Sequence, residues 1–197
     1  MKRIVINDLM NISVPVIERF VAVEPQPWTR KTILLELIGE IGSLAHLIQH
    51  WDGCKRGLPD PSDLADECSD VLFLILRLAY SEHIVLPHMI GCEQFQDIQA
   101  TDHVLELSRR AAALQDPDCD SSVELMSMLA TLACLSDCLG INLMQAHQRE
   151  MEIALYFFKA SGDRWPHPQP LRYPSATLHL VRLLWKRRMG SRKSNDI

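Results

Sequence analysis

The sequence predicts an all-α protein built as a helical bundle. Apolar residues recur with the 3.6-residue period of a helix along most of the 197-residue chain. No segment shows a convincing alternation of the kind a half-buried strand requires. Leucine, isoleucine, alanine and methionine dominate an apolar fraction of 47%, and aromatic residues make up only 6%. These are residues that favour helices.

The first three helices are predicted over 6–22, 29–51 and 61–82. Pro15 disturbs the first, because a proline inside a helix removes one backbone hydrogen bond. Thr29 is a suitable N-cap for the second, and Pro61 suits the first turn of the third. The remaining helical patterns follow Pro87 or polar and glycine-containing turns, and they are 87–100, 102–115, 121–139, 142–161 and 175–188.

These helices suggest two related units. The segments 66–86 and 123–143 share their helical length and their closing pattern, which indicates a weak internal repeat. In this alignment the second unit lacks most of the acids of the first. The aligned pairs are Glu67 with Glu124, Asp70 with Ser127 and, further upstream, Glu40 with Glu106.

We therefore expect two degenerate tandem helical units with extensions at both ends. The predicted parts are an N-terminal extension (1–28), a first unit with the acidic motif (29–100), a degenerate second unit (101–165) and a segment with a Pro-rich stretch, a last helix and a basic tail (166–197).

Charge and composition exclude several functional classes. The net charge of −5 gives no reason to expect nucleic acid as a partner. The longest apolar run, 71–80, contains Arg77 and is shorter than the ~20 residues that cross a bilayer. No secretory signal is recognisable at the start, and the six cysteines form no C-x-x-C pair. We expect a cytoplasmic protein with free thiols and no membrane partner.

Two neighbouring helices carry polar stripes in otherwise apolar surroundings. Residues at i, i+4 and i+7 lie on one side of a helix. The stripes are Glu36, Glu40 and Ser43 on the first helix, and Asp63, Glu67 and Asp70 on the second. A loop of about ten residues makes the helices antiparallel neighbours, so facing stripes would bring several carboxylates together.

Two explanations of these acids remain open. Acids in the first turn of a helix complement the helix dipole, which accounts well for Asp63 and Asp66. That explanation is weaker for Glu67 and Asp70, which run directly into an apolar segment. It is weakest for Glu40, which is surrounded by aliphatic residues. Mg²⁺ would instead resolve the repulsion of converging carboxylates, since it prefers oxygen ligands.

The two stripes also carry a resemblance to a known family. The stretches "LIGEIGSLAHLIQHW" and "LADECSDVLFLILRLA" resemble the motifs of the MazG-like, all-α nucleoside triphosphate pyrophosphohydrolases, whose relatives include the dimeric dUTPase and dCTP pyrophosphatase groups. The family signature is a Glu-x-x-Glu helix, a loop and a Glu-x-x-Asp helix that leads into an apolar stretch. Glu40, Glu67 and Asp70 match the first, third and fourth acids, over a matching region of about 30–85.

The resemblance implies an activity and a cofactor. Members hydrolyse nucleoside triphosphates to monophosphate and pyrophosphate with Mg²⁺, for which Mn²⁺ can substitute. It implies that Glu40, Glu67 and Asp70 bind the metal, with Glu36 as a substitute for the acid missing at Ser43. Glu40 and Glu67 would also be the catalytic carboxylates.

Other residues are predicted to contact the substrate. Arg149 and Lys159 would replace the phosphate-binding lysine of the family, which has no counterpart after the second acidic helix. Ser43 would coordinate weakly or through water. His46, which with His50 forms an H-x-x-x-H spacing, and Trp51 are candidates for contact with the base, although zinc binding and a core position are their respective alternatives.

Two departures from the family pattern keep a second function open. Ser43 removes one negative charge from the motif, and the phosphate-binding lysine is missing. The alternative is a catalytically impaired protein of this fold that binds a nucleotide or a protein partner. In either case we expect a homodimer.

Overall fold

Helices make up nearly all regular structure in the described part of the chain, which confirms the all-α prediction. The computed structural model describes residues 3–91 and 99–161. The helices are α1 (Ile6–Val23), α2 (Arg30–Trp51), α3 (Pro61–Ser81), α4 (Ala100–Ala113), α5 (Ser121–Cys138) and α6 (Leu143–Ser161). The predicted helix over 175–188 and the proline-rich segment before it lie outside the described residues.

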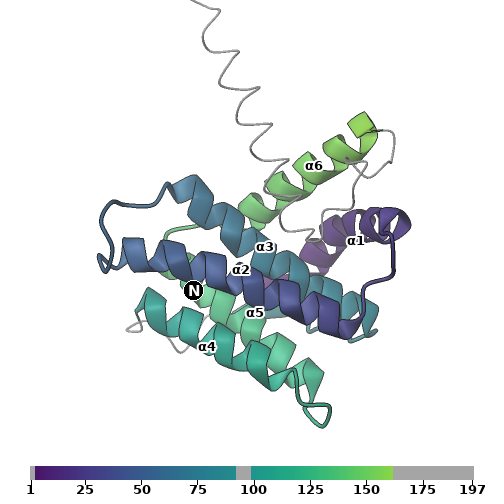
Figure 1. The fold of residues 1–197 in the computed structure, drawn as a ribbon, viewed down its shortest axis with the longest axis horizontal. Helices are drawn as coiled ribbons and strands as arrows, with labels where there is room; N and C mark the ends of the chain where they lie inside the picture. The colour runs from purple at the N-terminus through teal and green to yellow at the C-terminus, as the bar shows by residue number, and fades with distance from the viewer. Residues whose placement is uncertain (1–2, 92–98, 162–197) are drawn as a thin grey trace, which may run out of the picture.

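Helices α2 to α5 form a four-helix bundle (Figure 1). Helix α2 packs against α3 and α4, and α5 packs against the same two helices, so that α2 and α5 lie on opposite corners. Helices α1 and α6 pack against each other and cover α3. Because α3 contacts α1, α2, α5 and α6, the run from Cys68 to Ala79 is buried on every side of the helix.

Local sequence signals set most of the helix boundaries. Thr29 accepts a hydrogen bond from the Thr32 amide and caps α2, as predicted. Asp60 and Asp120 cap α3 and α5 in the same way. Pro15 lies inside α1 without ending it, and the helix continues to Val23.

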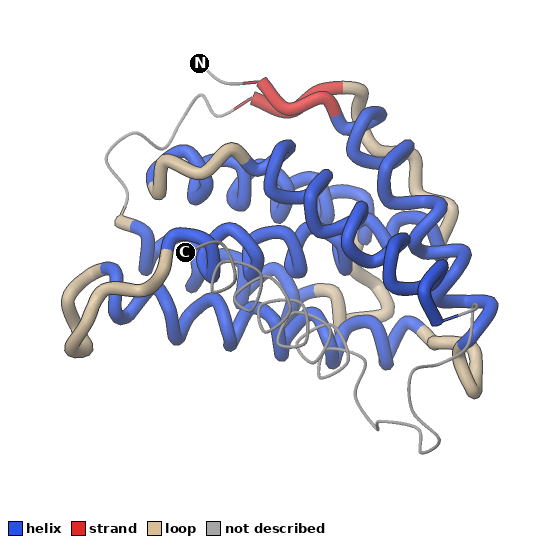
Figure 2. Tube along the Cα trace, turned by 90° about the horizontal axis from the view of Figure 1, so that it is seen from above, coloured by secondary structure: helices blue, strands red, loops and turns tan. Residues whose placement is uncertain are grey.

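The prediction of a helix from Pro87 is wrong at its start. Met89–Gly91 is a strand, β2, which pairs antiparallel with β1 (Arg3–Val5) at the end of the molecule near the N-terminus (Figure 2). Ile4 lies opposite Ile90, whose side chain is buried. Both strands have only three residues, too few for an alternating pattern to be recognised, and the pairing joins segments far apart in the sequence.

One apolar core contains residues from all six described helices. Helix α2 is long and apolar enough to cross a membrane by length and composition, as is the bent pair of α5 and α6 taken together, but core helices have the same properties. The prediction of free thiols holds for Cys54, Cys68, Cys119 and Cys138. It is wrong for Cys134, which is disulfide-bonded.

Candidate metal site

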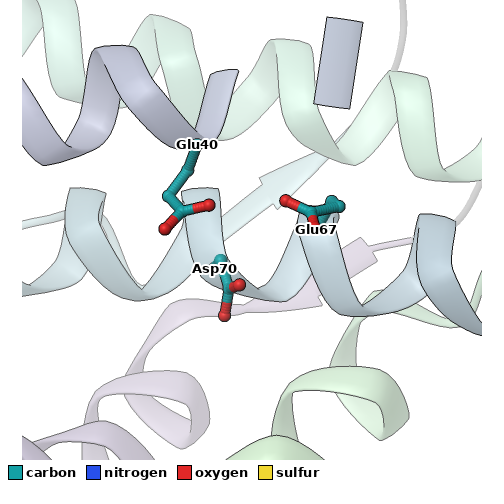
Figure 3. A group of neighbouring side chains, drawn as sticks. All are labelled: Glu40, Glu67 and Asp70. Atoms are coloured by element: carbon teal, nitrogen blue, oxygen red, sulfur yellow. The ribbon is translucent and has the colours of Figure 1, made fainter. Parts of the chain in front are cut away.

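Three carboxylates meet between α2 and α3. One oxygen each from Glu40, Glu67 and Asp70 lies within 4.8 Å of the others. In Figure 3, Glu40 extends from α2 towards α3, which carries Glu67 and Asp70 on neighbouring turns. Glu40 and Asp70 are only 7% and 5% exposed, and Glu67 is half-buried. Among the described residues, no other group of three or more metal-binding side chains comes together.

The helices bring these acids together for simple reasons. The apolar face of α2 is centred on residues such as Leu37, Ile41 and Leu44, and Glu40 lies at the edge of that face. The nine residues from Asp52 to Asp60 return the chain, so α3 runs back along α2. Glu67 and Asp70 are three residues apart and therefore lie one turn apart on the same side of α3.

The donor set suits a hard divalent cation. All three groups offer carboxylate oxygens, which Mg²⁺ prefers over nitrogen or sulfur. Neighbouring oxygens that bind one Mg²⁺ at 2.0–2.1 Å lie about 2.9 Å apart, so each carboxylate oxygen would need to move by about 1 Å. Three protein oxygens would leave room for water or phosphate oxygens in an octahedral shell.

The pKa of the Cys68 thiol, next to Glu67, shows how this region acts on a negative charge. Burial, with a smaller contribution from the negative charges of Glu67 and Asp70, raises the pKa of Cys68 to about 12, against a hydrogen bond with Ser136 that lowers it. The surroundings therefore disfavour any additional negative charge.

Glu36 is not part of this group. It is half-buried one turn before Glu40, and its charge acts on Arg77. Burial lowers the pKa of Arg77, while the hydrogen bond and charge of Glu24 and the charge of Glu36 act to raise it. Arg77 forms a buried ion pair with Glu24 and stacks 3.9 Å from the ring centroid of Trp28. Arg77 thus contacts a glutamate that follows α1 and does not reach the three acids directly.

The predicted substrate residues of α2 lie along one side of the helix. Ser43 is exposed one turn beyond Glu40. The Nδ1 atom of His46 lies 3.0 Å from Lys55 Nζ, and His50 Nδ1 lies 2.9 Å from the Arg56 carbonyl oxygen. These contacts hold the loop after α2 and do not gather ligands for zinc. Trp51 is 38% exposed, so it is not a core anchor.

Arg149 lies beside the acidic helix, whereas Lys159 does not. Arg149 Nη2 is 2.5 Å from Asp66 Oδ1, and the arginine side chain is 52% exposed. Asp66 is the residue before Glu67, so this contact brings a positive charge close to the three carboxylates. Lys159 lies ten residues further along α6, or about 15 Å along the helix axis, and its side chain is exposed.

Sequence reasoning missed a buried histidine near this site. His147 of α6 is fully buried and contacts Ser69, the residue before Asp70. The buried side of α6 carries His147, Glu150 and Met151, a spacing that could have indicated an inward-facing histidine.

Comparison with known proteins adds no assignment. No protein-family model, curated protein or solved structure matches the chain. The arrangement of the side chains themselves therefore has to support any functional proposal.

Proposed function

We propose that the protein hydrolyses a nucleoside triphosphate to the monophosphate and pyrophosphate with bound Mg²⁺. One observation carries the proposal: Glu40, Glu67 and Asp70, brought together from two helices, form a compact group of oxygen ligands in a mostly apolar bundle. The same three residues are the ones that match the MazG-like motif in order and spacing.

Each part of the site has a task in this reaction. Glu40, Glu67 and Asp70 would hold the cation, which would orient the phosphates and neutralise the charge that develops on them. Glu40 and Glu67 have further oxygens that can accept the proton of the attacking water. Water forms the new P–O bond at the α-phosphorus, and the bond to the pyrophosphate leaving group breaks.

Two basic residues support binding of the phosphate chain. Arg149 is half-exposed next to Asp66, so its guanidinium can turn to a phosphate without leaving a fully buried position. The contact of Lys55 with His46 holds the lysine next to the exposed side of α2. Both residues provide donors that suit phosphate oxygens.

A specific observation favours a second function. Ser43 is exposed and lies outside the group of three acids, so the second acid of the motif has no replacement there. A site with one charge fewer would bind its cation and phosphate more weakly. The alternative is a protein of this fold that binds a nucleotide or a protein partner without turnover.

Self-association belongs to the same proposal. Leu35 and Ile38 of α2 and Leu105 of α4 are 70%, 41% and 62% exposed, and α2 and α4 are neighbours. Exposed apolar side chains on neighbouring helices are candidates for a partner surface. A homodimer predicts twice the monomer mass, 22.5 kDa for each chain, in light scattering.

The function is tested by product analysis. The purified protein is incubated with ribo- and deoxyribonucleoside triphosphates and Mg²⁺ or Mn²⁺, and both monophosphate and pyrophosphate are measured. We expect equal amounts of the two products for at least one base, and loss of turnover in Glu67→Gln. Glu124→Gln, an acid at the aligned position of α5, is the matched control and should keep its activity.

Three outcomes separate the alternatives. Turnover that disappears only in Glu67→Gln supports the hydrolase. Mn²⁺ binding to folded protein without turnover of any triphosphate supports the binding protein instead. Turnover that survives in Glu67→Gln contradicts a role for the acidic site.

A further inference from the structure

His147 connects three helices inside the core. It lies on α6 and is fully buried, as are its two partners, Ser13 of α1 and Ser69 of α3. Its Nε2 atom is 2.7 Å from Ser13 Oγ, and its Nδ1 atom is 3.0 Å from Ser69 Oγ. Ser13 Oγ also donates a hydrogen bond of 2.8 Å to the Leu9 carbonyl oxygen.

One set of hydrogen-bond directions satisfies all of these contacts. Ser13 uses its only hydroxyl proton on Leu9, so it accepts the Nε2–H proton of His147. The Nδ1 atom of the neutral ring is then an acceptor, and Ser69 donates its hydroxyl proton to it. Every polar atom of the group is satisfied, which a buried polar network needs in order to hold a single arrangement.

The network reaches the acidic site through α3. Ser69 directly precedes Asp70, and Asp66, which pairs with Arg149 of α6, directly precedes Glu67. Helix α6 therefore holds α3 at two points, each immediately before one of the acids. Carboxylate oxygens lie roughly 6 Å from a helix axis, so a 20° rotation of this turn would move them by about 2 Å.

We propose that His147 is a positioning residue, which fixes the rotation of α3 through Ser69 so that Glu67 and Asp70 face Glu40. This inference rests on the proposed function, because it concerns the affinity of the same acidic site for a divalent cation. A shift of about 2 Å would place the oxygens outside the shell of one cation. Groups that orient metal ligands typically change metal affinity by about 10 to 100-fold when removed.

The test measures Mn²⁺ affinity together with thermal stability. His147→Leu fills the space but ends both hydrogen bonds, whereas His147→Gln offers a donor and an acceptor and should restore most of the affinity. Ser69→Ala removes only the contact to α3, and it keeps the test valid if His147→Leu does not fold. We expect the Mn²⁺ dissociation constant to rise about tenfold in His147→Leu and in Ser69→Ala.

The control is a variant that loosens α6 elsewhere. Phe158 packs against Phe20 of α1 at a ring distance of 4.9 Å, far along α6 from His147. Phe158→Leu should lower the melting temperature and leave Mn²⁺ affinity unchanged. If wild-type protein binds no Mn²⁺, the proposed function and this inference both fail. If wild-type protein binds Mn²⁺ and the His147 and Ser69 variants bind it equally well, only the role of His147 is overturned.

Discussion

The α2–α3 pair and the α4–α5 pair both place glutamates between neighbouring helices, but with different partners. In α4–α5, Arg110 joins the two helices, with its Nε 2.6 Å from Glu106 and its Nη1 3.1 Å from Glu124. In α2–α3, the aligned positions are Glu40 and Glu67, and Asp70 adds a third carboxylate. The arginine of α3, Arg77, pairs with Glu24 instead.

The difference shows two ways of balancing acids between helices. A guanidinium is permanently charged and uses its fixed donors on two carboxylates, which leaves no place for a ligand. The side chains of Glu106 and Arg110 are 32% and 23% exposed, so solvent shares the task of neutralising them. Glu40 and Asp70 are far more buried and need stronger compensation. An exchangeable cation would provide it and would also leave positions for phosphate.

The largest expected effect comes from exchanging one glutamate in each pair. Glu40→Gln should weaken Mg²⁺ and Mn²⁺ binding by about 100-fold, because it replaces a charged carboxylate ligand with a neutral amide. Turnover should fall with it. Without metal, the variant should be as stable as wild type or more stable, because one of three converging charges is gone. Melting curves with and without Mg²⁺ measure both effects.

Glu106→Gln is the matched change in the other pair. Its response to Mg²⁺ and its turnover should equal those of wild type, while its stability should fall by about 1 kcal/mol through the weakened contacts to Arg109 and Arg110. The comparison of the two pairs breaks down if Glu106→Gln loses the response to metal as well.

The contact of α6 with α3 and the α4–α5 pair should lose stability in different pH ranges. Burial lowers the pKa of His147, behind α3, from 6.5 to about 4. Between these values the unfolded chain binds a proton that the folded protein does not, so stability falls as the pH drops from 6.5 to 4. The full effect of this one group is about 3 kcal/mol. Denaturant unfolding from pH 7 to pH 4 measures it, with His147→Gln as the variant that lacks this slope.

Glu106 should act at lower pH. Hydrogen bonding from Arg109, opposed by desolvation and helped by Arg110, lowers its pKa from 4.5 to about 2. Its stabilising contribution is present above pH 4.5 and is lost as the pH falls towards 2, by about 1 kcal/mol after screening by solvent. A difference between wild type and Glu106→Gln that does not change with pH in this range would contradict the assignment.

Arg110 itself should also contribute to stability. Arg110→Met should destabilise the protein by about 1 to 2 kcal/mol, because Glu124 loses its ionic partner while Glu106 keeps Arg109. A double-mutant cycle with Glu124→Gln in urea should give a coupling energy of about 1 kcal/mol. A coupling near zero would mean that the cross-link between α4 and α5 contributes nothing to stability.

Much of the fold could be predicted because it depends on local signals. Helical periodicity, the cap at Thr29 and the proline in the first turn at Pro61 place α2 and α3 within one or two residues of their observed bounds. The pairing of β1 with β2 could not be predicted, because it joins two three-residue segments more than 80 residues apart. The disulfide bond of Cys134 could not be predicted either, because no local spacing of cysteines indicates it.

The candidate site could likewise be predicted only as far as it depends on local spacing. Helix spacing places Glu67 and Asp70 on one side of α3, and the short loop brings α2 alongside, so the three acids could be expected to meet. The same spacing equally suggested Glu36, which lies instead near Arg77. The sequence does not reveal which residues of α1 and α6 reach α3, so the contacts of Glu24 with Arg77 and of His147 with Ser69 were missed.

The last prediction adds the acid that the motif lacks. Ser43 is exposed one turn after Glu40, so Ser43→Glu would place a fourth carboxylate beside the other three. Metal affinity should rise by about fivefold, or about 1 kcal/mol, since affinity grows with ligand charge. Without metal, repulsion from Glu40 should lower the stability of the folded protein by about 0.3 kcal/mol. Mn²⁺ titration and melting curves measure the two changes.

Gln49→Glu is the control, because it adds the same negative charge to α2 at a position far from the three acids. Gln49 is exposed on α2, nine residues after Glu40 and about 13 Å further along the helix. It should leave Mn²⁺ affinity almost unchanged, because salt screens a charge at that distance. If both variants tighten binding equally, the effect is long-range attraction and Ser43 has no special place. If only Ser43→Glu does so, the α2–α3 pair is a metal site one ligand short, and the serine explains any weakness of the wild-type activity.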